Sequence, residues 1–272
     1  NALTYKEIPK SSNALTYNDI KFYNDRRHYR GQLINNVENG QGIMYQNGKM
    51  LYDGKWKDGK KNGPGTLYYE SGNVKYIGNF TDDNFNGEGT LYHQKGKKKT
   101  KYEGGWKNGK KHGKGIEYDI DGIEYYNGEW KNGQKNGKGT SYFLPSQLPS
   151  YVLDKNIREY EGNWKDDKKN GKGTSYWTDG KKKEYDGKWK DGKYDEGTLY
   201  YQDGETKIGK GKFVDEELNG KGILYHKNGN KEYEGDFTNG KFVKGKKYDS
   251  NGKIKYEGDF TNGKFVKGKK YD

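Results

Sequence analysis

The stretch YDGKWKDGKKNGPGTLYY, residues 52–69, contains the pattern that decides the fold. In its first part Tyr52, Gly54 and Trp56 alternate with charged residues, which is the two-residue period of a strand with one buried face. Asp-Gly and Asn-Gly steps follow, and both tolerate the positive φ angles of tight reversals. The stretch therefore predicts an antiparallel hairpin with an aromatic face.

The same pattern recurs along the chain, which makes the hairpin the unit of a repeat. Most copies start 23 to 26 residues apart, and about ten are present, with weaker ones near Tyr29 and Lys210. A hairpin of this size is marginal alone, so neighbouring hairpins must stack to bury their aromatic rows. The clear copies begin at Tyr52, Tyr76, Tyr102, Tyr126, Tyr160, Tyr185, Tyr233 and Tyr256.

The second strand of each unit carries a β-branched residue and, two positions later, a Tyr, as in Thr66 and Tyr68. We predict that both lie on the same buried face as Tyr52. The residue between them, such as Leu67 or Leu91, would then face outward and belong to a partner or self-association patch. The predicted structural repeat core comprises Tyr52, Gly54, Trp56, Tyr68, Tyr102, Trp106, Tyr126, Trp130, Tyr160, Trp164, Tyr185 and Trp189.

Composition favours an aromatic core over a conventional aliphatic one. Only 28% of the 272 residues are hydrophobic and the net charge is +13, a combination that alone would indicate disorder. The chain nevertheless has 27 Tyr, 9 Phe and 6 Trp to supply the packing, and it has no Cys for disulfides or thiolate chemistry. We therefore predict an all-β fold, an elongated single-layer antiparallel meander of stacked hairpins.

These repeats resemble MORN (membrane occupation and recognition nexus) repeats, whose units follow Tyr-Glu-Gly-x-Trp-x-x-Gly-x-x-x-Gly-x-Gly. YDGKWKDGKKNGPG from Tyr52 and YNGEWKNGQKNGKG from Tyr126 carry the resemblance, which covers about residues 29–272. It implies an array of hairpins without enzymatic activity, used as a scaffold, dimerising or partner-binding element. Phosphoinositide or membrane association is proposed for the family but is not shared by every member.

The predicted organisation is an N-terminal lead-in or degenerate cap at residues 1–28, followed by repeats over residues 29–272. The step between Tyr126 and Tyr160 is longer and contains an insertion near residues 143–159. Its apolar side chains form either a docking loop or a loop that folds back on its own hairpin. The candidate docking residues are Leu144, Leu148, Val152 and Leu153.

The sequence offers little for catalysis. The four His residues are scattered, and no zinc-protease, nucleophile-elbow or Walker motif occurs. DDNFNG from Asp82 starts like a calcium loop, but His93 stands at position twelve, where a bidentate Glu is required. We expect no enzymatic activity, no metal or other cofactor and no small-molecule substrate.

Lysine pairs in the tight loops are the main candidate for binding. Stacking would align them along one edge as a basic stripe for anionic lipid or an acidic protein partner. Solubility and protection of the sheet edge explain the same lysines without a ligand. The candidate residues are Lys60, Lys61, Lys110, Lys111, Lys168 and Lys169.

We expect protein partners or self-association, with an anionic membrane as the alternative partner. Nucleic acid is disfavoured, because the stripe has no Arg for base edges and the aromatic side chains are committed to the sheet. A cytoplasmic location, with association to a membrane or the cytoskeleton, is favoured.

Overall fold

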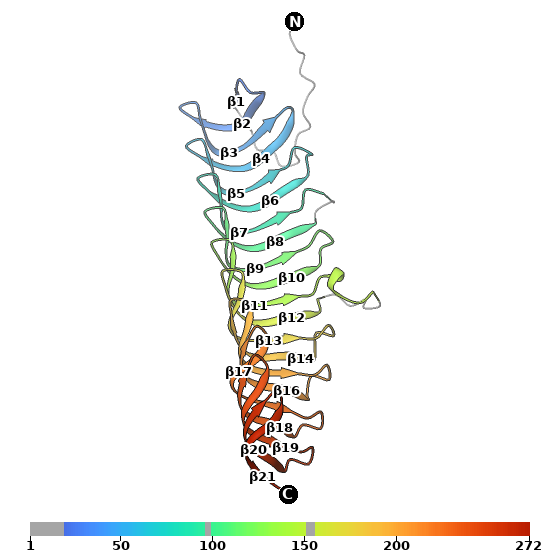
Figure 1. The fold of residues 1–272 in the computed structure, drawn as a ribbon. Coiled ribbons are helices and arrows are strands. Elements are labelled where there is room, and N and C mark those ends of the chain that lie inside the picture. The colour runs from blue at the N-terminus through green and yellow to red at the C-terminus, as the bar shows by residue number, and fades with distance from the viewer. Residues whose placement is uncertain (1–18, 96–98, 151–155) are drawn as a thin grey trace. The chain divides into compact units, whose positions relative to one another are not determined.

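A computed structural model describes residues 19–95, 99–150 and 156–272. In these residues the chain forms 21 strands and one short 3-10 helix (Figure 1). They divide into two compact units, one containing the residues up to Thr100 and Trp106–Gly109, the other containing Lys101–Gly105 and Lys110–Asp272. The prediction of an all-β antiparallel meander of stacked hairpins is confirmed.

In the first unit, β1 to β7 pair antiparallel in sequence order. The strand β8 is divided between the two units. The bounds are β1 (Asp19–Phe22), β2 (Arg27–Ile34), β3 (Val37–Gln46), β4 (Lys49–Lys57), β5 (Lys60–Tyr68), β6 (Val74–Thr81), β7 (Asn84–Tyr92) and β8 (Thr100–Lys107).

In the second unit, β9 to β21 pair in the same sequential way. The short helix η1 (Pro145–Gln147) lies in the insertion after β11. The bounds are β9 (Lys110–Tyr118), β10 (Glu124–Lys131), β11 (Gln134–Tyr142), β12 (Arg158–Lys165), β13 (Lys168–Tyr176), β14 (Lys183–Lys190), β15 (Lys193–Tyr200), β16 (Lys207–Val214), β17 (Glu217–Tyr225), β18 (Lys231–Thr238), β19 (Lys241–Tyr248), β20 (Ile254–Thr261) and β21 (Lys264–Lys270).

Tight turns join the two strands of each hairpin, as the Asp-Gly and Asn-Gly steps predict. Asp58 and Gly59, between β4 and β5, have φ of 50° and 76°. Asn132 and Gly133, between β10 and β11, have φ of 54° and 91°. Positive φ at both central residues is typical of type I′ turns, whose twist matches that of the flanking strands.

The buried layer consists of Tyr rings that lie against a column of glycines. Tyr52 is fully buried, and its hydroxyl donates a hydrogen bond to the carbonyl of Lys55 at 3.0 Å. Gly54 and Gly65 lie opposite each other beneath this ring, and a Cβ on Gly65 would come within 2.3 Å of the Tyr52 hydroxyl. The glycines are therefore required by close packing against the ring.

Large aromatic side chains from neighbouring strands close this layer by edge-to-face contacts. Trp56 meets Tyr52 at 5.2 Å and Tyr29 at 5.5 Å between ring centroids, both nearly perpendicular. Its indole N–H donates to the carbonyl of Gly42 at 3.0 Å. Each ring thus bridges two hairpins, which links the stability of one repeat to that of the next.

The prediction for the second strand was wrong about which face it buries. Tyr52 lies opposite Leu67, and Asp53 lies opposite Thr66. Directly opposed residues of an antiparallel pair point to the same face, so Leu67 shares the Tyr52 face, while Thr66 and Tyr68 share the other. Tyr68 is half-buried on that second face and does not belong to the tyrosine core.

The turn determines which residues share a face, because the two-residue turn at Asp58 and Gly59 places Lys61 opposite Trp56 and therefore Leu67 on the Tyr52 face. Gly54 pairs with Gly65 and Trp56 with Lys61, so β5 advances four residues where β4 advances two. This bulge adds two residues and therefore leaves the alternation of faces unchanged. The same register makes Leu91 lie opposite Tyr76 and half-buried, so the predicted outward-facing leucine patch is wrong as well.

Candidate functional site

The predicted repeat-core residues other than Tyr68 lie on the tyrosine face. The Tyr side chains of this set are fully buried and the Trp side chains are at most 7% exposed. We call the surface they occupy the tyrosine face and the opposite surface the outer face. This set comprises Tyr52, Gly54, Trp56, Tyr102, Trp106, Tyr126, Trp130, Tyr160, Trp164, Tyr185 and Trp189.

The predicted basic stripe is divided between the two faces. Lys60, Lys110 and Lys168 are exposed beside the tight turns. The second lysine of each pair points to the opposite face, because adjacent strand residues alternate. There Lys61, Lys111 and Lys169 are half-buried and cover the rings of the core. All six lie at the turn ends of their strands, as predicted for one edge, but only the first lysine of each pair is fully exposed there, and a binding role for this edge stays a prediction.

The lysines on the tyrosine face, Lys61, Lys111 and Lys169, combine cation–π contacts with ion pairs. Lys111 Nζ lies 4.2 Å from the Trp130 ring centroid and pairs with Glu117. Lys169 Nζ lies 5.0 Å from the Trp189 ring centroid and 2.8 Å from a Glu159 carboxylate oxygen. The lysines on the tyrosine face are thus already engaged by aromatic rings and by carboxylates of the same face.

Lys135 occupies the equivalent place one hairpin further on and was missed by the sequence interpretation. Its Nζ lies 4.7 Å from the Tyr126 ring centroid and 5.0 Å from that of Trp164. Burial lowers the pKa of Lys135 and of Lys111 from the usual value. Lys111 and Lys135 each stand nine residues after a repeat Tyr, at a place that we call the covering position. In other units the same position holds Phe85, Tyr194 or Phe242. The covering position therefore accepts either a lysine or an aromatic ring.

Lys135→Phe should change the free energy of unfolding by no more than about 1 kcal/mol, because an aromatic ring fits the covering position. A lysine with a lower pKa in the folded state loses its proton at a lower pH in the folded chain than in the unfolded chain. Stability therefore rises with pH from that folded pKa toward 10.5, the ordinary value. The variant should lose this rise, as measured by urea unfolding at several pH values below 10.

Lys111→Phe is the matched comparison for that variant. Glu117 is 8% exposed and pairs with Lys111, so this substitution leaves a buried carboxylate without its cation. We expect a loss of about 2 kcal/mol in the free energy of unfolding. Equal effects of the two substitutions would contradict the assignment of Lys111 and Glu117 as a structural ion pair.

The predicted docking loop is described only in part. Leu144 and Leu148 flank η1 and are half-buried, while Val152 and Leu153 lie outside the described residues. After the loop, Ile157 is 8% exposed and its carbonyl accepts a hydrogen bond from the backbone N–H of Phe143 at 2.9 Å. The described part of the insertion is thus attached to its own hairpin, and its docking role stays a prediction.

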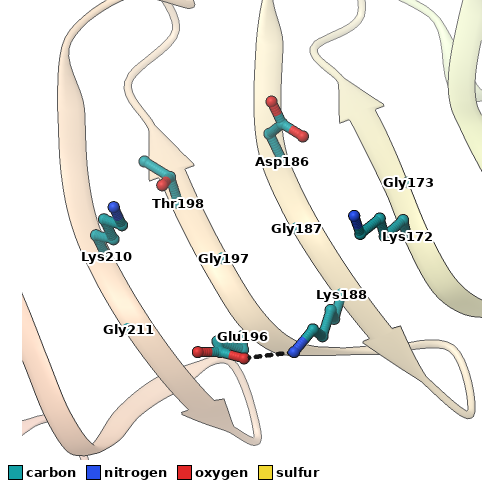
Figure 2. A pocket seen from close by; sticks show the side chains of 10 residues that line it. All are labelled: Lys172, Gly173, Asp186, Gly187, Lys188, Glu196, Gly197, Thr198, Lys210 and Gly211. Carbon is teal, nitrogen blue, oxygen red and sulfur yellow. Dashed lines mark hydrogen bonds and ion pairs between the residues drawn. The ribbon is translucent and has the colours of Figure 1, made fainter.

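A groove on the outer face was not foreseen from the sequence. It has a volume of about 650 Å³ and crosses β13 to β16 of the second unit (Figure 2). Its floor is a row of glycines, and charged side chains stand on both sides. The lining residues are Lys172, Gly173, Asp186, Gly187, Lys188, Glu196, Gly197, Thr198, Lys210 and Gly211.

Two ion pairs partly neutralise the groove. Lys188 Nζ lies 2.8 Å from a carboxylate oxygen of Glu196, as Figure 2 shows. Lys183 Nζ lies 2.7 Å from a carboxylate oxygen of Asp186. Lys172 and Lys210 are exposed at the groove. Hydrogen bonding to Lys188 lowers the pKa of Glu196, which therefore carries its negative charge at neutral pH.

The described residues provide neither a metal-binding cluster nor a membrane-spanning helix. Among residues 19–95, 99–150 and 156–272, no three His, Asp or Glu side chains are grouped to hold a metal ion. The part of the chain that the structure describes also contains no helix long and apolar enough to span a membrane.

Comparison with family models identifies the repeat. The MORN repeat model matches nine stretches, residues 29–50, 52–74, 76–98, 102–123, 126–143, 160–182, 185–206, 233–254 and 256–271. The chain belongs to the MORN repeat family, a class of non-enzymatic repeats that mediate protein or membrane interactions. No curated protein matches the chain.

The hairpin β16–β17 lies between matched stretches and keeps the register of the others. Gly211 pairs with Gly222, but Gly209 stands where the other units have Tyr. Leu218, which is 5% exposed, fills the vacated place and lies near the position of a Cβ on Gly211. The column of glycines thus continues through a unit that lacks the tyrosine.

Proposed function

We propose that the chain is a non-enzymatic structural scaffold, whose MORN array binds protein partners or further copies of itself at a membrane or cytoskeletal structure. The observation that carries this proposal is the regular outer face. Successive strands place equivalent side chains in cross-strand columns, as in Glu234, Lys246 and Glu257. Such columns present charges at regular spacing to a protein surface, while the aromatic side chains of the opposite face supply stability.

Membrane binding through the lysine-rich edge is the alternative. Lys57 lies directly opposite Lys60, and Lys165 opposite Lys168, so like charges are held together beside exposed turns. Such pairs are unfavourable within a sheet, and an anionic surface would relieve their repulsion. Against this alternative, the turn between Lys165 and Lys168 contains Asp166 and Asp167, which offset two positive charges.

We also propose the domain organisation that the repeats predict. Residues 1–28 act as a lead-in or cap, and residues 29–272 form about ten repeats with an insertion near residues 143–159. The strand β1 (Asp19–Phe22) lies within the proposed lead-in and pairs with β2 of the first repeat, which supports a capping role. Residues 1–18 lie outside the described part of the chain.

Co-sedimentation with vesicles distinguishes the scaffold from the membrane module. Phosphatidylserine or phosphoinositide vesicles are used at low and at physiological salt, with the full chain and with a Lys60→Ser, Lys110→Ser, Lys168→Ser variant. The scaffold proposal predicts weak retention that disappears at physiological salt, because screening removes long-range attraction between exposed charges.

The matched control removes three exposed lysines from loops at the other ends of the strands, Lys181→Ser, Lys227→Ser and Lys253→Ser. Retention at physiological salt that is lost only in the first variant would establish the lysine edge as a membrane surface and overturn the scaffold proposal. Retention lost equally in both variants would reflect net charge alone.

A further inference from the structure

We propose that the outer-face groove across β13 to β16 binds an extended acidic peptide segment of a partner protein. The inference rests on the scaffold function and assigns it a surface and a ligand chemistry. Four glycines from four neighbouring strands lie in register along the floor, with Gly173 opposite Gly187 and Gly197 opposite Gly211. The groove therefore runs across the strands, as Figure 2 shows.

Charge balance in the column beside the glycines differs between the groove and the last repeats. In the last repeats the column beside the glycines alternates in sign, and Lys244 lies between Asp236 and Asp259. At the groove this alternation fails, because Lys172 lies opposite Lys188. Like charges directly opposite each other destabilise a sheet, so the groove holds positive charge that its own strands do not offset.

Lys210 is the second cation without an acidic cross-strand neighbour. It lies opposite Thr198 on one side and Ile223 on the other. With Lys188 paired to Glu196 and Lys183 paired to Asp186, the cations left to a ligand are Lys172 and Lys210. They stand on opposite sides of the groove, on its first and last strands.

The spacing of these strands fits a peptide. Three strand-to-strand steps of about 4.8 Å place β13 and β16 about 14 Å apart, which about four residues of an extended chain span. Carboxylates four residues apart can therefore reach Lys172 and Lys210 together.

A peptide also fits the mixed charges better than a polyanion does. The carboxylates of Glu196 and Asp186 line the same groove. A chain with a phosphate on every unit would be repelled by them, whereas the N–H groups of a peptide backbone can donate hydrogen bonds to them. Two separated acidic side chains, joined by small polar residues, match this arrangement.

Fluorescence anisotropy with two labelled peptides tests the proposal on the full chain at low salt. One peptide carries two Glu residues separated by three Gly or Ser residues, and the other has Gln in place of both Glu. Saturable binding of the Glu peptide, at least tenfold tighter than that of the Gln peptide, is expected. Lys172→Gln combined with Lys210→Gln should weaken it at least tenfold.

Lys244→Gln combined with Lys267→Gln is the matched control, since both lysines are exposed and lie beside the same glycine column. This variant should bind the peptide within twofold of the unchanged chain. Equal weakening by both double variants, equal binding of the two peptides or no saturable binding would overturn the proposal. Circular dichroism confirms that each variant is folded.

Anionic vesicles form the last arm of the test. Retention of phosphatidylserine vesicles that depends on Lys172 and Lys210, in place of peptide binding, would make the groove a lipid site and overturn the proposal. If the peptide fails while vesicles are also not retained at physiological salt, the scaffold function stands and only this groove is rejected as its binding site.

Discussion

Raising the pH from 9 to 11 should lower the free energy of unfolding of the second unit by about 4 kcal/mol. Tyr126, Tyr160 and Tyr185 are fully buried, and burial raises the pKa of each above the ordinary value of 10. An acid with a higher pKa in the folded state stabilises the fold below its unfolded pKa. That stability is lost as the pH rises above 10 toward the folded value.

The size of this effect follows from the titration of the unfolded chain. A buried Tyr stays neutral above pH 10, while the same residue ionises in the unfolded chain. Each such Tyr therefore lowers the free energy of unfolding by about 1.4 kcal/mol per pH unit above 10. Three such residues give about 4 kcal/mol at pH 11, a large part of the 5 to 15 kcal/mol that is typical of folded domains. A loss of this size brings a unit at the lower end of that range close to the midpoint of its unfolding transition.

Tyrosinate absorbance and far-ultraviolet circular dichroism, recorded in one titration, measure this prediction. Exposed tyrosines should ionise near pH 10, and a second group should ionise only together with loss of sheet signal. Tyr160→Phe, which removes a hydrogen bond to the carbonyl of Asn163, should reduce the loss of stability at pH 11 by about 1.4 kcal/mol. Ionisation of all tyrosines near pH 10 with the sheet intact would contradict the burial of these rings.

Gly187→Ala should destabilise the second unit by about 3 kcal/mol or more. A Cβ at Gly187 would lie 2.5 Å from the carbonyl oxygen of Glu196, 2.5 Å from the Cα of Gly197 and 2.7 Å from the Tyr185 hydroxyl. Two of these atoms belong to the backbone of the neighbouring strand, so the strands would have to separate. Urea unfolding followed by tryptophan fluorescence measures the loss.

Gly209→Ala is the control, because this glycine lies in the one described hairpin whose Tyr position is vacant. The nearest atoms to its Cβ would be the Leu218 and Leu224 methyl groups at 3.2 and 3.3 Å, both of them side-chain atoms that can shift. We expect a change below about 1 kcal/mol. Similar losses for Gly187→Ala and Gly209→Ala would show that the close approach of the neighbouring backbone and the Tyr185 ring at Gly187 is not the source of the requirement.

The fold could be predicted because the local sequence of each repeat indicates both the alternation of its strands and the residues of its turns. Alternation in YDGKW marks the first strand, and the Asp58-Gly59 and Asn132-Gly133 steps mark the reversals, so hairpins and their stacking follow from the sequence. Ring burial at Tyr52 and Trp56 follows as well, since aromatic side chains make up more than half of the hydrophobic residues, 15% of the chain out of 28%.

The faces of the second strand were assigned from its Thr66 and Tyr68 pattern alone, without following the alternation back to the two-residue turn, which sets Lys61 opposite Trp56 and hence Leu67 on the Tyr52 face. Tyr68 was consequently placed on the tyrosine face and Leu67 on the outer face. The lysine pairs were placed on one edge without distinguishing the two faces, between which adjacent strand residues alternate. The groove depends on cross-strand neighbours such as Lys172 and Lys188, which are 16 residues apart, and pairing across β13 and β14 must be known to find it.

The central claim is that stability and binding are separated on opposite faces of the same sheet. Nuclear Overhauser contacts from the Tyr52 ring test this separation most directly. We predict contacts to the α-protons of Gly65 and to the side chain of Lys61, whose Nζ lies 5.8 Å from the ring centroid, and none to the Thr66 methyl group. Contacts from the Tyr52 ring to Thr66 in place of Gly65 and Lys61 would contradict the account, because the proposed binding face would then be the buried one.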